Sequence, residues 1–172
     1  MYWRPWRWTE DGWYGAWVAA LCCGVIAEIG FFGDLALVTV AGLTGLLAGT
    51  LVAGRHEGRV LAGRSFVVEG LGVGFRAGIL SLVGGWVALS VGTILFKTEY
   101  PLEDRLMQVV YGLVGVPTYG ALFGGPFALL GGIVGALILR MVRRHGRTGT
   151  LLLVVASAIV VVVGIDALVT WL

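Results

Sequence analysis

Long apolar stretches constrain the fold of this chain more than any other feature of its sequence. A helix needs about 20 apolar residues to cross the hydrocarbon core of a bilayer. Backbone amides find no partners in lipid, so the spans must be helical, and the ten-residue alternation typical of barrel strands is absent. We therefore predict an all-α fold, a polytopic transmembrane helix bundle in which residues 1–172 form one membrane domain. About five spans are expected, at residues 13–31, 35–54, 78–96, 115–139 and 150–172.

The scarcity of polar side chains supports this class of protein. Hydrophobic residues make up 58% of the chain and charged residues 13%, whereas a soluble domain has about 25% charged residues. Asparagine is absent, there is one glutamine, and serine occurs four times. So few polar groups cannot cover the surface of a soluble particle. The composition therefore excludes a soluble enzyme, a secreted disulfide scaffold and a nucleic-acid binder.

Basic residues lie mostly on one side of the five-span arrangement. Ten of the twelve lysines and arginines fall on the side of the N-terminus, and only Lys97 and Arg105 fall on the other. The cytoplasmic loops of membrane proteins carry such an excess of basic residues. We therefore expect an integral protein of the cell (plasma) membrane, with its N-terminus in the cytoplasm and its C-terminus outside.

The segment 65–77 precedes the third span and carries a narrow polar stripe on an otherwise apolar helix. Ser65, Glu69, Gly72 and Arg76 recur there at helical spacing. This pattern indicates either an amphipathic helix on the membrane surface or an extension of the third span. Glu69 and Arg76 form a candidate ion pair.

The fourth span lies within a longer apolar region, residues 109–139, which contains Pro117 and Pro126. Proline kinks a helix without ending it where neighbouring groups satisfy the freed backbone. One long kinked helix is therefore expected, and a re-entrant segment followed by a span is the alternative.

Glycine is unusually frequent, with 29 copies, or about 17% against a usual 7%. Many glycines recur with alanine every four residues, which places small side chains along one helix face and lets a neighbouring backbone approach closely. Packing within one bundle is the first interpretation, packing against another subunit the second, and a glycine-lined pore the third. Three strips are predicted as helix-packing interfaces: Ala41, Gly45, Gly49 and Ala53; Gly70, Gly74 and Gly78; and Gly120, Gly124, Ala128, Gly132 and Ala136.

Carboxylates inside apolar stretches are candidates for function, because a charged group is costly in lipid. Glu28 and Asp166, with Asp34 at the outer boundary, form a candidate intramembrane polar site. Glu28 and Asp166 lie at similar depth in spans that run in the same direction. The acids either reach interfacial water or a neighbouring backbone, share a cation or a proton, or pair with a cation of a partner subunit.

Two groups of residues are predicted to contact lipid headgroups. Tryptophan rings and arginine side chains favour the interface between the bilayer and water, and loop arginines attract anionic lipid. The predicted anchors are Trp3, Trp6 and Trp8 near the N-terminus, and Arg140, Arg143, Arg144 and Arg147 in the loop before the last span.

Motifs for catalysis or metal binding are absent from the sequence. It contains no HExxH, CxxC, GxSxG or Walker pattern. His56 and His145 lie in arginine-rich loops and are expected to be solvated, while Cys22 and Cys23 are expected to be small packing residues. We therefore predict a protein that is not an enzyme and that binds no metal and no cofactor.

These features favour a non-catalytic integral membrane protein that acts as a packing or assembly subunit of a homo-oligomer or a larger membrane complex. Its expected partners are the lipid bilayer and other membrane subunits, either further copies of itself or different chains, and not nucleic acid. The alternative is a small transporter or channel that uses the intramembrane carboxylates.

Overall fold

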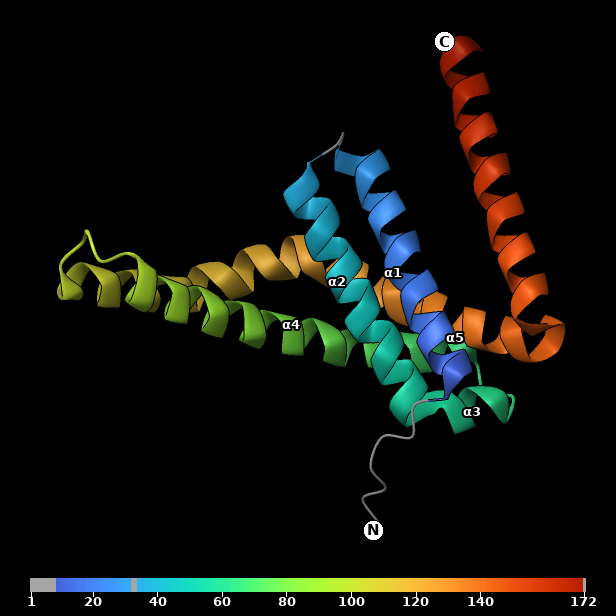
Figure 1. The fold of residues 1–172 in the computed structure, drawn as a ribbon, viewed down its shortest axis with the longest axis horizontal. Coiled ribbons are helices and arrows are strands. Elements are labelled where there is room, and N and C mark those ends of the chain that lie inside the picture. The colour runs from blue at the N-terminus through green and yellow to red at the C-terminus, as the bar shows by residue number, and fades with distance from the viewer. Residues whose placement is uncertain (1–8, 32–33, 172) are drawn as a thin grey trace.

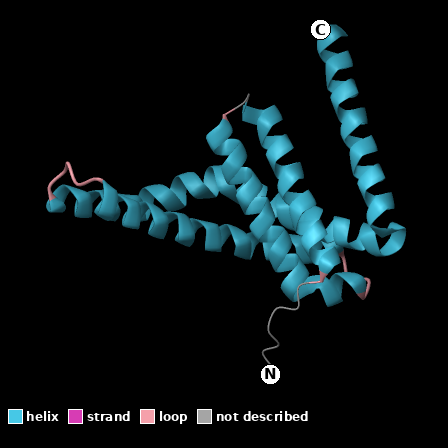
Figure 2. Ribbon diagram, in the orientation of Figure 1, coloured by secondary structure: helices cyan, strands magenta, loops and turns pink. Residues whose placement is uncertain are grey.

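The computed structural model describes residues 9–31 and 34–171 and builds them almost entirely from helices (Figure 2). Among the described residues, four helical stretches are long and apolar enough to cross a membrane, and the last of them ends at residue 160. The all-α class is confirmed, and these stretches indicate an integral membrane protein. The elements are α1 (Glu10–Phe31), α2 (Leu35–Leu51), the π-helix η1 (Val52–His56), α3 (Glu57–Leu61), α4 (Phe66–Phe96) and α5 (Leu102–Trp171).

Two antiparallel helix pairs cross each other in the molecule (Figure 1). Helices α1 and α2 form the first pair, and α4 forms the second with the N-terminal part of α5. The second pair extends well beyond the crossing as a long arm, whose tip is the loop between α4 and α5. The core lies at the crossing, where Ala48, Val73, Ala128 and Ala136 are fully or almost fully buried.

Helix α5 contains one interruption, at Gly146. The backbone there has φ 73° and ψ 172°, a combination that is essentially restricted to glycine. It divides α5 into two helical segments, residues 102–145 and 147–171. Figure 1 shows that the second segment leaves the crossing in a different direction, and the side chains described at residues 151–160 are mostly exposed.

The structure decides between two pairs of alternatives that the sequence left open. Residues 66–77 continue directly into the third predicted span as one helix, α4, as an extension of that span requires. Pro117 and Pro126 both lie inside the first segment of α5, and the only non-helical backbone within α5 is at Gly146. Residues 109–139 are therefore part of one continuous helix and contain no re-entrant segment.

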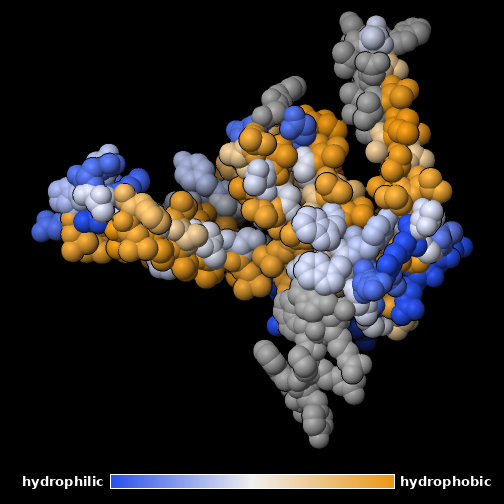
Figure 3. Space-filling model, in the orientation of Figure 1, coloured by the Kyte–Doolittle hydropathy of each residue, from blue (hydrophilic) through white to orange (hydrophobic). Residues whose placement is uncertain are grey.

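The surface agrees with a membrane location. In Figure 3, hydrophilic side chains gather at the tip of the arm and around the turn between the two segments of α5, and apolar side chains cover most of the surface between them. Large apolar residues of the arm, such as Leu89, Val110 and Leu122, are exposed. Lipid accommodates such a surface, whereas a soluble monomer rarely exposes so large an apolar patch.

Candidate functional site

The small-residue strip on α2 and η1, formed by Ala41, Gly45, Gly49 and Ala53, packs against neighbouring helices of the same chain. A Cβ atom built on Gly49 would lie 2.6 Å from the Cα of Ala16 in α1, and one built on Gly45 would lie 2.8 Å from the Cys23 sulfur. The other side of this strip meets α5, where a Cβ built on Gly131 would lie 2.7 Å from the Gly45 Cα. The two ends of the strip, Ala41 and Ala53, are also buried.

The strips on α4 and α5 pack mainly against each other. A Cβ built on Gly70 would lie 2.6 Å from the Ile133 Cα, and Gly74 and Gly132 are in equally close backbone contact. The remaining members are accounted for within the chain: Gly78 lies against Ala128, Gly120 against the Leu82 side chain, Gly124 near Thr44, and Ala128 and Ala136 are fully buried. All three strips therefore have partners within one copy of the chain.

A fourth strip, which the sequence analysis missed, has no such partner. Gly84, Ala88 and Gly92 recur every four residues on the arm portion of α4. A Cβ built on Gly84 or Gly92 would meet nothing within 4 Å, and Ala88 is exposed. Gly84 follows Ala77 by seven residues, which is close to two full helical turns, so the strip lies on the same face of α4 as the buried Ala77 and continues along the arm beyond the crossing. The four-residue spacing was the available signal.

A buried polar cluster lies where η1 and α3 meet the start of α4. His56, the last residue of η1, is only 5% exposed, so the expectation of a solvated loop histidine is wrong. Its Nδ1 lies 2.6 Å from Glu69 Oε2, and its Nε2 lies 3.3 Å from an Arg76 guanidinium nitrogen. The predicted ion pair of Glu69 with Arg76 is thus replaced by a chain in which His56 connects the two residues.

Arg76 and Glu69 together suit one tautomer of this histidine. An arginine can only donate, so its contact with Nε2 uses the lone pair of that nitrogen, and Nδ1 then carries the proton that it donates to the Glu69 carboxylate. Both ring nitrogens therefore have partners, as a buried polar group requires.

Two further arginines approach Glu69, Arg59 from within α3 and Arg64 from the turn that follows α3. The backbone N–H of Arg64 donates to the carbonyl of Arg59, and that of Gly63 donates to the carbonyl of Val60. This is the Schellman arrangement that ends a helix, and Gly63 supplies the positive φ of 86° that it needs. The turn brings the two arginines to the same carboxylate, with nitrogen–oxygen distances of 3.9 Å for Arg59 and 3.7 Å for Arg64.

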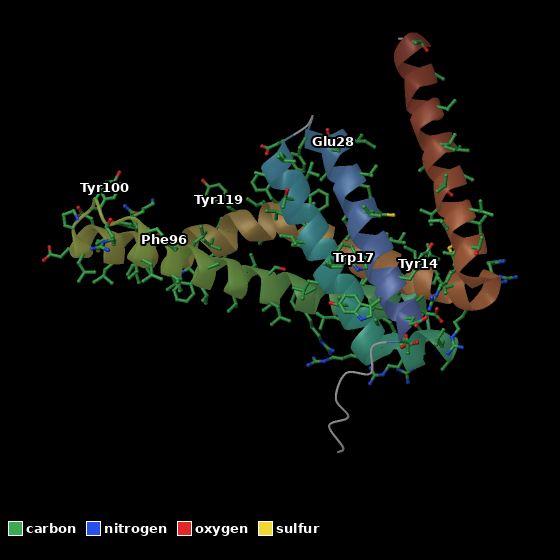
Figure 4. All side chains as sticks on the ribbon, in the orientation of Figure 1. Tyr14, Trp17, Glu28, Phe96, Tyr100 and Tyr119 are labelled. Atoms are coloured by element: carbon green, nitrogen blue, oxygen red, sulfur yellow. The ribbon has the colours of Figure 1, made fainter. Side chains whose placement is uncertain are left out.

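The predicted intramembrane acids do not form a described site. Glu28 is exposed near the end of α1, next to the turn into α2 (Figure 4). Asp34 caps the N-terminus of α2, because one carboxylate oxygen accepts from the backbone N–H groups of Ala36 and Leu37 at 3.0 and 3.2 Å. Asp166 belongs to the second segment of α5, but its side chain lies outside the described part of the structure.

The predicted headgroup anchors fall into three groups. Trp3, Trp6 and Trp8 lie outside the described residues. Arg140, Arg143 and Arg144 are exposed near the end of the first segment of α5. Arg147 instead forms ion pairs with Glu10 and Asp11 at 2.8 and 2.9 Å, and so connects the turn at Gly146 to the start of α1.

Comparison with protein-family models, with curated proteins and with solved structures gives no match. Among the residues that the structure describes, no three histidine, cysteine or acidic side chains come together as a group that could hold a metal ion.

Proposed function

We propose that this chain is a non-catalytic integral membrane protein that acts as a packing subunit, either with further copies of itself or within a larger membrane complex. The observation that carries this proposal is the strip Gly84, Ala88 and Gly92, because a Cβ atom built on either glycine would meet no described atom within 4 Å. Close backbone approach is the main source of helix association in lipid. A strip that is open on a long arm is therefore suited to a helix from another subunit.

The proposal includes the five-span arrangement and its orientation. The two segments of α5 on either side of Gly146 would supply the fourth and fifth spans. The exposed arginines Arg140, Arg143 and Arg144 would then lie in the cytoplasm with the N-terminus, and the loop at the arm tip would lie outside. The uneven distribution of basic residues supports this orientation in the plasma membrane.

A transporter or channel is the second candidate, and the observation in its favour is Glu28. This carboxylate is exposed on a candidate span, and no side chain in the described part of the chain bonds to it. Acids within membrane spans often mark ion or proton pathways. We prefer the assembly function because three residues along one helix face support it, whereas a single carboxylate supports transport.

Disulfide crosslinking in intact membranes tests the assembly proposal. In a variant without the native cysteines, Ala88→Cys would place a thiol in the middle of the open strip. If two copies pack through this face, mild oxidation will give a covalent dimer. The control is Gly115→Cys, because Gly115 lies on α5 of the same arm and a Cβ atom built on it would also meet nothing within 4 Å.

Dimer formation at both positions, in equal yield, would indicate random collision and count against the strip. A different partner chain need not carry a cysteine there, so a photoactivatable crosslinking residue at position 88 detects it, and a larger complex would give a crosslinked product of another mass at position 88 only. Absence of any product at position 88 in native membranes would contradict the proposal.

A further inference from the structure

We propose that Arg59, Arg64 and the exposed face of α4 that follows them form a binding site for one anionic phospholipid. The two guanidinium groups would hold the phosphate, and the apolar residues of α4 would hold an acyl chain. The site is separate from the open glycine strip and does not require a second subunit.

The charge of the cluster leaves a positive excess. The cluster contains a single carboxylate, Glu69, with Arg59 and Arg64 beside it and Arg76 joined to it through His56. Three positive charges and one negative charge leave an excess of two. A phosphate group would reduce that excess, and planar guanidinium groups bind phosphate oxygens through paired N–H donors.

The geometry keeps the two outer arginines close together without saturating them. The Schellman turn joins their backbones, and both side chains lie against Glu69. At nitrogen–oxygen distances of 3.9 and 3.7 Å, neither forms a full hydrogen bond with the carboxylate. The side chains are 59% and 68% exposed, so most of their N–H donors are available to a ligand outside the protein.

Exposed apolar residues lie on the same turns of α4 as Glu69, on the far side of Gly72 from that carboxylate. Val68, Leu71 and Phe75 are 69%, 40% and 63% exposed, and their spacing of three and four residues places them on one helix face. Gly72 lies among them with nothing within 4 Å, which leaves room for an acyl chain. A soluble phosphate compound would gain nothing from this surface, so the combination favours a lipid.

The test measures lipid binding to delipidated protein by native mass spectrometry, with phosphatidylglycerol as the anionic probe and phosphatidylcholine as the neutral one. Arg59→Gln with Arg64→Gln should weaken phosphatidylglycerol binding about thirtyfold, from the loss of two arginine contacts. The control, Lys97→Gln with Arg105→Gln, removes the same charge at the tip of the arm and should weaken it less than about fivefold.

Two further measurements separate the lipid from other anions and from misfolding. Phe75→Ala should weaken phosphatidylglycerol binding while leaving the arginines in place, and inorganic phosphate at the same concentration should not displace the lipid. Arg59→Lys with Arg64→Lys keeps the charge and should bind with intermediate affinity. Three results would overturn the proposal. They are an equal loss of phosphatidylglycerol binding in the two double glutamine variants, equal binding of the two lipids, and displacement of the lipid by inorganic phosphate.

Discussion

At the scale of single residues, His56 is the clearest test of the structure. His56→Leu has a similar volume but leaves Glu69 without its shortest hydrogen bond and Arg76 without an acceptor. Loss of one partner from a buried polar pair costs about 1–3 kcal/mol, so the variant should unfold at a lower temperature in detergent. The matched control is His145→Leu, because His145 is exposed and its replacement should change stability by less than about 0.5 kcal/mol. Equal unfolding temperatures for the two variants would contradict the described cluster.

The importance of His56 could not be predicted from the sequence alone. The polar stripe of Glu69 and Arg76 was visible as a helical pattern, but the residue that joins them comes from a different helix. His56 stands between arginines, which is typical of a loop. The helical backbone instead continues through η1, and the π-helical turn ends with His56 buried against α4. No local signal in the sequence specifies that extra turn.

At the scale of helices, two glycines on α4 give a prediction with a built-in control. Gly70→Ala would bring a Cβ to 2.6 Å from the Ile133 Cα, so α4 and α5 must separate at a cost of about 1–3 kcal/mol. Gly72→Ala on the same helix meets nothing within 4 Å, and should be neutral or stabilise the helix by up to about 1 kcal/mol. Thermal unfolding of both variants measures the difference. If Gly72→Ala were as damaging as Gly70→Ala, the packing of α4 on α5 would be wrong.

A second prediction at this scale concerns the interruption of α5. Gly146→Ala would place a Cβ on a backbone conformation that costs other residues about 1–3 kcal/mol. The variant should relieve this strain by shifting the direction of the second segment, which would weaken the ion pairs of Arg147 with Glu10 and Asp11. A spin-label distance between residues 21 and 152, which are both exposed, would report the shift. The same distance distribution in variant and wild type would contradict it.

The helices themselves were largely predictable, whereas their partners were not. Small residues at every fourth position show which face of a helix is smooth, but they do not show which helix packs there. Gly45 and Gly49 therefore looked equally suited to an internal and an external neighbour, and the structure pairs them with α1 and α5. The lengths of α4 and α5 also exceeded the predicted spans, because hydropathy alone does not show where a helix continues beyond an apolar stretch.

At the scale of the whole molecule, the internal contacts of the three filled strips concentrate at the crossing of the two helix pairs. The arm beyond the crossing has few long-range partners other than its own second helix, and its open strip lies on that part (Figure 1). A subunit built in this way would hold itself together at one end and present a helix face to its neighbours at the other. The central claim is that this face is occupied in the membrane.

The mass of the particle, measured by native mass spectrometry after gentle extraction from native membranes, tests that claim most directly. We expect the wild-type chain to be found as a homo-oligomer or with a second chain. Gly84→Leu with Gly92→Leu should release single chains, because leucine holds a partner backbone away from the strip. Gly115→Leu, at an open glycine on the other helix of the arm, should keep the wild-type mass. A wild-type particle with the mass of one chain, or no change in the Gly84 and Gly92 double variant, would contradict the account.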